Sequence, residues 1–128
     1  MKDILVVDDD RIVLELVKRV LGREGFVAYG AESGEEALEQ IKERTFSLMI
    51  TDYNMPGLNG LELARKGLEL APQMPIIMDS GMISPNLVRL AKEIGISRVL
   101  PKPFLVTELM ETVRDVMEMQ REWAPSAG

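Results

Sequence analysis

The segment ILVVDDD, residues 4–10, places three acidic residues directly after an uninterrupted apolar run. Similar short runs recur along the chain, and the five are Ile4–Val7, Phe26–Tyr29, Leu48–Ile50, Ile76–Met78 and Val99–Leu100. Continuous apolar character over so few residues is typical of strands in a parallel sheet that is covered on both faces. The pattern therefore predicts five strands in one such sheet.

Amphipathic stretches separate these runs, with apolar residues recurring at steps of three and four, which predicts helices with one buried face. Ser33 and Glu36 have the spacing of a capping box, and Ser84-Pro85 is typical of a cap followed by a first-turn proline. Helices are expected to stop near three glycines, Gly22, Gly25 and Gly95. The order βαβαβαβαβα predicts one α/β domain with right-handed crossovers and helices on both faces of the sheet.

Composition narrows the function further. The 128 residues suit a single domain, and a net charge of −6, from 21 acidic against 15 basic residues, argues against a dedicated nucleic-acid binder. The absence of cysteine and histidine excludes disulfides, thiolate chemistry and the usual neutral-pH catalytic base. No apolar run approaches the ~20 residues that cross a bilayer, and the first residues do not resemble a secretory signal. We therefore expect a cytoplasmic protein that does not bind membranes.

Polar residues follow four of the predicted strands. They are Asp8, Asp9 and Asp10 after the first, Thr51 and Asp52 after the third, Asp79, Ser80 and Gly81 after the fourth, and Pro101, Lys102 and Pro103 after the fifth. Because parallel strands point their carboxyl ends at the same edge, these side chains are expected to gather there. The sequence thus predicts a site of carboxylates, a hydroxyl and an ammonium group.

Such a group of carboxylates needs a positive partner, because like charges held close together raise one another's pKa. Lys102 supplies one charge, and an all-oxygen site of this kind fits Mg²⁺ better than a transition metal. Asp52, interpreted as a single acid exposed at the entry to a loop, is the candidate nucleophile toward phosphorus. Lys102 and the cation would neutralise charge on the phosphoryl oxygens, and the Ser80 hydroxyl would donate a hydrogen bond to one of them.

Each of these features also has an ordinary explanation. Taken alone, Asp8–Asp10 would be explained by a helix N-terminus, and Lys102 by an ordinary lysine on a solvated surface. Ser80-Gly81 alone would be a turn, and residues 52–57 alone would be an Asx or proline turn. Their joint placement at the ends of four predicted strands makes coincidence the weaker interpretation.

Four segments together resemble the receiver domain of two-component response regulators, of the chemotaxis-receiver kind. They are ILVVDDD at 4–10, LMITDYNMPGLNGLEL at 48–63, IIMDSG at 76–81 and LPKPF at 100–104. The resemblance covers almost the whole chain. It implies a doubly wound, flavodoxin-like (βα)5 domain whose sheet has the strand order 2-1-3-4-5.

The resemblance also implies roles for single residues. Asp52 would accept a phosphoryl group from a phosphohistidine on a sensor histidine kinase or a histidine phosphotransfer protein. Mg²⁺, or alternatively Mn²⁺, would be held by Asp8, Asp9, Asp52 and the backbone carbonyl of Asn54. Ser80 would be the switch hydroxyl, Lys102 would pair with the carboxylate and then with the phosphate, and Pro103 would follow a cis peptide bond.

By the same resemblance, phosphorylation changes the surface formed by residues 84–121 and so its affinity for a downstream effector protein or an output domain outside this sequence. A homodimer through this face is the alternative. We expect the receiver domain to span 1–121, with 122–128 a tail or the start of a linker. This domain is not expected to contact nucleic acid.

Three residues, Val99, Asp79 and Leu105, depart from the family pattern, and Met82 carries a separate expectation. Val99 replaces the usual aromatic residue, which puts the ring movement that follows phosphorylation in doubt. Asp79 replaces an apolar residue, and the favoured interpretation is an exposed strand end, against an extra acid that tunes metal or partner binding. Met82 is expected to slow self-dephosphorylation. Leu105 stands where a capping residue is expected, at a cost of ~1 kcal/mol to the last helix.

Two other functions are alternatives to this one. A phosphatase of the haloacid dehalogenase type also uses an aspartate nucleophile with Mg²⁺, but it needs a second aspartate where this chain has Asn54, and a cap domain. A degenerate receiver would act only as a phosphorylation-independent binding module. The complete set of Asp8, Asp9, Asp52, Ser80 and Lys102 argues against the module, whereas Val99 and Asp79 favour it.

Overall fold

The computed structural model describes residues 2–123, with side chains through residue 119. Five parallel strands form one sheet in the order β2-β1-β3-β4-β5, and a helix follows each strand. The strands are β1 (Asp3–Val7), β2 (Val27–Ala31), β3 (Leu48–Asp52), β4 (Ile76–Ser80) and β5 (Arg98–Pro101). The helices are α1 (Arg11–Arg23), α2 (Gly34–Glu43), α3 (Gly60–Leu70), α4 (Pro85–Ile94) and α5 (Val106–Trp123). The predicted fold and strand order are confirmed.

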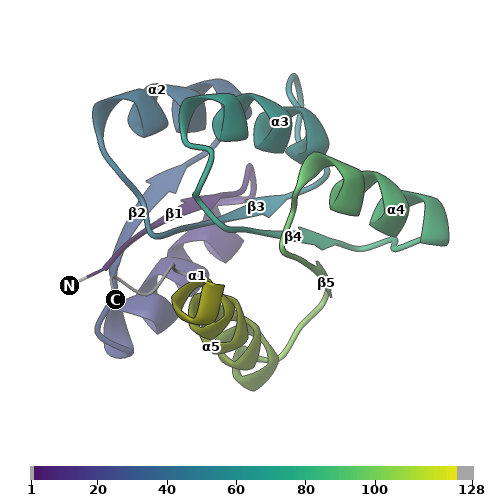
Figure 1. Cartoon of the computed structure of the whole chain (residues 1–128). Coiled ribbons are helices and arrows are strands. Elements are labelled where there is room, and N and C mark those ends of the chain that lie inside the picture. The colour runs from purple at the N-terminus through teal and green to yellow at the C-terminus, as the bar shows by residue number, and fades with distance from the viewer. Residues whose placement is uncertain (1, 124–128) are drawn as a thin grey trace.

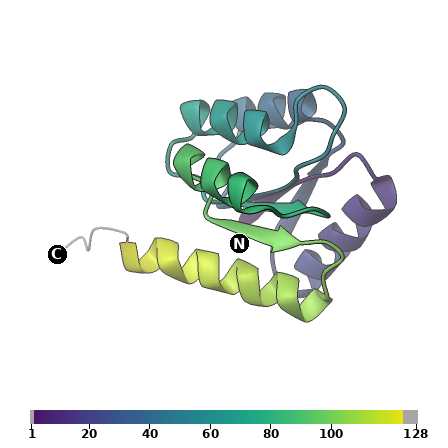
Figure 2. The same ribbon diagram turned by 90° about the vertical axis from the view of Figure 1, so that its right-hand side faces the viewer.

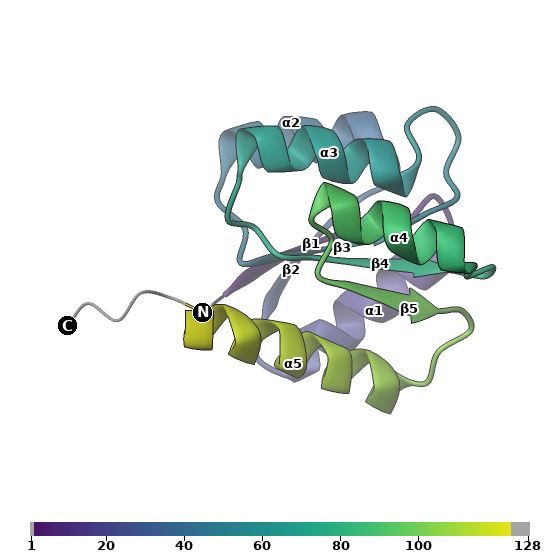
Figure 3. The same cartoon turned by 45° about the vertical axis from the view of Figure 1, so that its right-hand side comes forward.

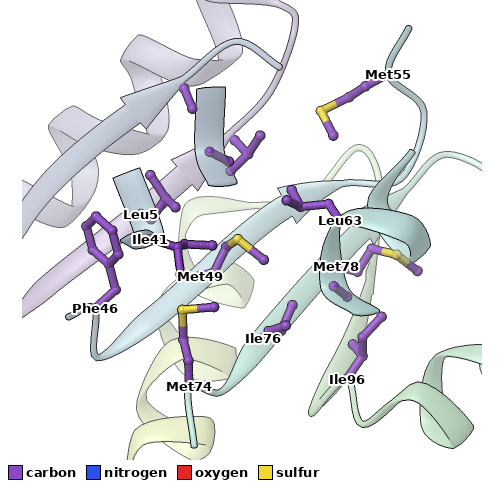
Figure 4. Packing of buried hydrophobic residues seen from close by; sticks show 14 of the residues in the cluster. Leu5, Ile41, Phe46, Met49, Met55, Leu63, Met74, Ile76, Met78 and Ile96 are labelled. Carbon is purple, nitrogen blue, oxygen red and sulfur yellow. The ribbon is translucent and has the colours of Figure 1, made fainter. Parts of the chain in front are cut away.

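The helices form two layers, one on each side of the sheet. Helices α2, α3 and α4 cover one face, and α1 and α5 cover the other (Figure 1). Leu5, Met49 and Met78 point toward the first layer, where they pack with Ile41 and Leu63 (Figure 4). A separate hydrophobic cluster packs the second layer against the sheet, with residues from α1, α5 and the opposite face of the strands. Burial on both faces explains why the strands are nearly continuous apolar runs.

All five strands differ by one or two residues from the predicted boundaries: β1 begins one residue earlier, β5 is longer by one residue at each end, and β2, β3 and β4 end later. Asp52 and Ser80 are the last residues of β3 and β4, and Asp79 precedes Ser80 within β4. The sequence placed all three after the strands, because their side chains are polar. Their backbones nevertheless continue the ladder, with Asp52 paired to Asp79 and Ser80 to Pro101. Strand β2 also begins one residue later than predicted and runs to Ala31.

The helix ends confirm some predicted signals and correct others. Ser33 and Ser84 cap α2 and α4, and Gly95 ends α4 in the left-handed conformation at φ 110°. Glu36, however, accepts from the backbone N–H of Glu32 rather than from that of Ser33, so the predicted capping box is only half formed. Gly22 lies inside α1 instead of ending it.

The last helix, α5, runs beyond the expected end of the domain at residue 121 and ends at Trp123. Residues 124–128, most of the predicted tail, lie outside the described part of the chain. Among residues 2–123, no helix combines the length and the apolar character that spanning a bilayer requires.

Candidate functional site

Three aspartates at the ends of three strands meet at the carboxyl edge of the sheet, the edge at which the arrows of β4 and β5 end in Figure 3. Asp8 follows β1, Asp52 ends β3, and Asp79 lies in β4. The apolar residue two positions before each of them packs in the cluster beneath α1 and α5. Since side chains alternate along a strand, the three acids project from that same face. One oxygen from each lies within 4.8 Å of the other two.

Lys102 joins this cluster from the end of β5. Its Nζ lies 3.1 Å from Asp8 Oδ2, 3.5 Å from Asp52 Oδ2 and 3.5 Å from Asp79 Oδ1. Its backbone N–H donates to the carbonyl of Ser80 at 2.9 Å, which fixes the start of the following loop against β4. The peptide bond from Lys102 to Pro103 is cis, as predicted. One ammonium group therefore faces three carboxylates.

Burial and mutual repulsion shift the pKa values of these groups. Burial raises the pKa of Asp52, with Asp8 adding to the rise and the charge of Lys102 opposing it. Burial likewise raises the pKa of Asp79 to about 7. The charge of Lys102 lowers this pKa, and the charges of Asp52 and Asp8 add to the rise. For Lys102, burial alone would lower the pKa, but the charges of Asp79, Asp8 and Asp52 raise it. Lys102 therefore stays protonated, while the carboxylates exceed it in charge.

The favoured prediction for Asp79, an exposed strand end, is wrong. The residue is only 3% exposed, because its strand lies between β3 and β5 and its side chain turns into the cluster. Its Oδ1 accepts no hydrogen bond. The interpretation of Asp52 as an exposed acid at a loop entry is also wrong, since Asp52 is 7% exposed and belongs to β3.

The other predicted metal ligands lie at the rim of the cluster. Asp9 is exposed and is not among the three acids whose oxygens converge. Asn54 is exposed as well, and its backbone N–H donates to Asp52 Oδ1 at 3.3 Å. The backbone N–H of Asp10 donates to Asp8 Oδ1 at 2.9 Å, and Asp10 itself caps α1. The assignment of Asp9 and of the Asn54 carbonyl as ligands stays a prediction.

Ser80 lies beside the acids but is bonded elsewhere. Its hydroxyl donates to the carbonyl of Met82 at 2.9 Å and accepts from the N–H of the same residue at 3.2 Å. Ser80 is 1% exposed, whereas the side chain of Met82 is largely in solvent. A change in the partner of the Ser80 hydroxyl would therefore shift the loop that leads into α4.

Val99, in β5, is half-buried against the cluster beneath α2, α3 and α4.

Gly60 is a positioning residue that the sequence reasoning did not single out. A Cβ at this position would lie 2.6 Å from the carbonyl oxygen of Asp52 and 2.9 Å from the Cα of Tyr53. The N–H of Gly60 donates to the Tyr53 carbonyl at 2.8 Å, which closes the loop after β3. Only glycine permits this approach, so α3 begins directly against the strand end that carries Asp52. The signal lay in the quoted motif at 48–63, where glycine follows Asn59.

The donor set suits a hard divalent cation. Its described side-chain donors are carboxylate oxygens, the ligands that Mg²⁺ and Mn²⁺ prefer, and they exceed the single ammonium in charge. The buried Asp79 oxygen without a hydrogen bond is a further sign that the cluster is short of positive partners. The residues present therefore fit the predicted cation.

A family model described as the response regulator receiver domain matches residues 4–114 of this chain. The chain belongs to this family. Receiver domains are signalling switches that are generally not enzymes, and they work with histidine kinases and output domains. The acidic pocket at the sheet edge is the kind of site at which they bind Mg²⁺. The predicted family is thus confirmed for this receiver domain.

Two curated relatives illustrate the match. The receiver domain is 30% identical over 117 residues to the response regulator receiver protein CpdR of Brucella abortus, an alignment that covers 91% of this chain and 98% of CpdR. It is 37% identical over 117 residues to the transcriptional regulatory protein CpxR of Escherichia coli, covering 91% of this chain and 50% of CpxR. This chain therefore spans about half the length of the CpxR relative.

Solved structures agree with the fold. A CheY-like receiver domain protein from Methanospirillum hungatei superposes with a TM-score of 0.91 at 30% identity, covering 95% of this chain and 98% of the other. The chemotaxis protein CheY4 of Vibrio cholerae gives a TM-score of 0.87 at 30% identity, covering 91% of this chain and 98% of the other.

Proposed function

We propose that this receiver domain is a phosphorylation-dependent switch in which Asp52 accepts a phosphoryl group with the help of Mg²⁺. The observation that carries the proposal is the meeting of Asp52 with Asp8 and Lys102 at the edge of the sheet. An Asp52 oxygen would attack phosphorus in a phosphohistidine of a sensor kinase or phosphotransfer protein. The bond from nitrogen to phosphorus would break, and the electron pair and a proton would return to the imidazole.

The neighbouring residues supply the charge that this transfer needs. Lys102 Nζ, 3.5 Å from Asp52 Oδ2, is close enough to follow the charge from the carboxylate to the new phosphoryl oxygens. Asp8, Asp52, Asp9 and the Asn54 carbonyl are our ligands for Mg²⁺ or Mn²⁺, which would neutralise the phosphoryl oxygens during transfer. The chain contains no histidine and therefore cannot be the phosphohistidine donor itself.

The signal would leave the site through Ser80. A phosphoryl group adds about −1.5 to −2 charges and three acceptor oxygens, which compete with the Met82 carbonyl for the Ser80 hydroxyl. Once that hydroxyl turns inward, the loop that begins at Gly81 shifts, and with it the surface of residues 84–121. This surface would regulate an effector protein, an attached output domain or a second copy of the chain.

The remaining assignments follow from the same proposal. We assign residues 1–121 to the receiver domain and 122–128 to a tail or the start of a linker. The domain would work in the cytoplasm, where its kinase presents the phosphohistidine, and it would bind neither membranes nor nucleic acid.

Labelling with acetyl phosphate and Mg²⁺, followed by mass spectrometry of the intact protein, tests the proposal. We expect one phosphoryl adduct in the wild type, none in Asp52→Asn, and an unchanged adduct in Asp115→Asn, which alters an exposed acid on α5. An adduct that persists in Asp52→Asn would overturn the assignment of Asp52. Steady release of phosphate from a small phosphoester would instead favour the phosphatase.

A phosphorylation-independent binding module is the second candidate. It is favoured by Asp79, because this extra acid occupies Lys102 at 3.5 Å and adds negative charge beside the phosphoacceptor. Complete absence of an adduct at saturating donor and cation would support the module and contradict the switch.

A further inference from the structure

Asp79 is a buried acid for which phosphoryl transfer as proposed above has no use. It lies beside Asp52 in the register of β3 and β4, and both project toward α1 and α5. The residue is 3% exposed, and its side chain turns toward the oxygens of Asp8 and Asp52 rather than toward solvent. A carboxylate in this place loses its hydration and needs a replacement for it.

Lys102 does not fully supply that replacement. Its Nζ is 3.1 Å from Asp8 but 3.5 Å from Asp79, and Asp79 Oδ1 accepts no hydrogen bond in the described structure. The cluster holds three carboxylates against one ammonium, all buried or half-buried. Removal of Asp79 would leave two carboxylates for Lys102. Asp79 therefore contributes one of the two negative charges by which these carboxylates exceed the ammonium of Lys102.

We propose that Asp79 belongs to the cation-binding residues of this site, and that with Asp8 and Asp52 it gives the chain a higher affinity for Mg²⁺ and Mn²⁺ than Asp8 and Asp52 alone would provide. The inference deepens the proposed function and rests on it for the identity of the cation. It assigns a purpose to an acid that otherwise only destabilises the end of β4. The cation is recognised by charge and oxygen chemistry, so Mn²⁺ serves as the probe.

The test is a titration of Mn²⁺ into the unphosphorylated protein, in which electron paramagnetic resonance measures the free Mn²⁺. Mg²⁺ is then added as a competitor to obtain its affinity. We expect Asp79→Asn to weaken the affinity for both ions by at least about tenfold, because a carboxylate within a few ångströms of the ion loses its charge. Asp79→Val should have an equal or larger effect. Asp115→Asn, the exposed control on α5, should bind as the wild type does.

Urea unfolding in EDTA separates a role in cation binding from a merely structural one. Without a cation, removal of the buried charge should leave the stability of Asp79→Asn equal to or above that of the wild type. Weaker Mn²⁺ binding by an equally stable variant would support the inference. If Asp79→Asn does not fold, Asp79→Val, which suits the apolar face of a central strand, takes its place.

A double-mutant cycle with Lys102→Met excludes an indirect effect. If Asp79 acts on the ion itself, Asp79→Asn weakens Mn²⁺ binding in the Lys102→Met background as well. The inference is overturned if the effect vanishes there, or if Asp79→Asn binds within twofold of the wild type. The Mn²⁺ titration contains no phosphoryl donor and does not depend on phosphorylation. Failure to label Asp52 would therefore contradict the proposed function without deciding this inference.

Discussion

At the scale of single residues, the charge around Lys102 governs both the chemistry and the stability of the site. Three carboxylates lie within 3.5 Å of its Nζ and hold the ammonium group in place. The same arrangement keeps Asp52 next to a positive charge that can pass to a phosphoryl group. Ionised Asp79, however, is buried at the expense of folding free energy when no cation is bound.

The stability of the cation-free protein should therefore depend on pH through Asp79. Burial raises the pKa of this carboxyl to about 7 from its ordinary 3.8, so the folded chain holds the proton more tightly than the unfolded chain does. Asp79 favours folding most below about pH 4, and that contribution is lost as the pH rises from about 4 to 7. The loss is at most about 4 kcal/mol, because one pKa unit corresponds to about 1.4 kcal/mol.

Urea unfolding in EDTA between pH 4.5 and 8 measures this dependence. Because other carboxyl groups also titrate, the quantity to follow is the free energy of unfolding of Asp79→Asn minus that of the wild type. We expect this difference to become more positive with rising pH. Parallel profiles for the two proteins would contradict the burial of an ionisable Asp79.

Met82 gives a second prediction at this scale. Its side chain is 82% exposed beside Ser80, so a substitution there should leave the fold intact. Met82→Glu places a carboxylate that can orient water near the phosphoryl group, and we expect dephosphorylation of Asp52 to become severalfold faster. The decay of the adduct by mass spectrometry tests this, with Val88→Glu, an exposed site on α4, as the control. An unchanged decay rate would exclude the role of Met82.

At the scale of elements, the start of α5 has no side-chain cap. The Leu105 carbonyl accepts the first helical bond, from the N–H of Leu109, and Glu108 accepts from the N–H of Leu105 at 2.8 Å. Leu105 itself offers no oxygen to the free N–H groups of the first turn. Half of a capping box is thus present, and the predicted uncapped start is confirmed.

Leu105→Ser should complete that cap. Because Leu105 is 67% exposed, little packing is lost, and we expect the free energy of unfolding to rise by about 1 kcal/mol. Chemical denaturation measures the change. Leu105→Ala is the matched control, since it shortens the side chain without adding an oxygen and should give no such gain. Equal stabilities of the serine and alanine variants would show that the cap contributes nothing.

The limits of sequence reasoning appear most clearly in β3 and β4. The apolar runs locate both strands, because their interiors are covered on both faces. An acid after an apolar run usually marks a loop, so the sequence predicts Asp52 and Asp79 outside the strands. Their burial depends on Lys102, which arrives from β5, and on the strand pairing that sets Asp52 beside Asp79. Such long-range contacts leave no local pattern in the sequence.

At the scale of the whole molecule, the two helices of the proposed output surface are held differently. Only Leu87 and Ala91 of α4 are buried, whereas the part of α5 whose side chains are described, up to residue 119, buries four apolar side chains, Leu109, Met110, Val113 and Val116. Between them, β5 forms the edge of the sheet (Figure 2). Elements with few buried contacts open at lower free-energy cost, so α4 is the part of this surface that a shift at Ser80 moves most easily.

Hydrogen exchange of phosphorylated and unphosphorylated protein tests where the signal travels. We expect the largest change in amide exchange over residues 81–94, where the loop after Ser80 leads into α4, and little change in the firmly packed segment 109–116 or in α2. Ser80→Ala should still be labelled on Asp52 but should lose the change over residues 81–94. It lacks the hydroxyl whose hydrogen bond would move from the Met82 carbonyl to the phosphoryl group. A change of equal size in α2, or an undiminished change in Ser80→Ala, would mean that phosphorylation acts on the molecule by a route that bypasses Ser80.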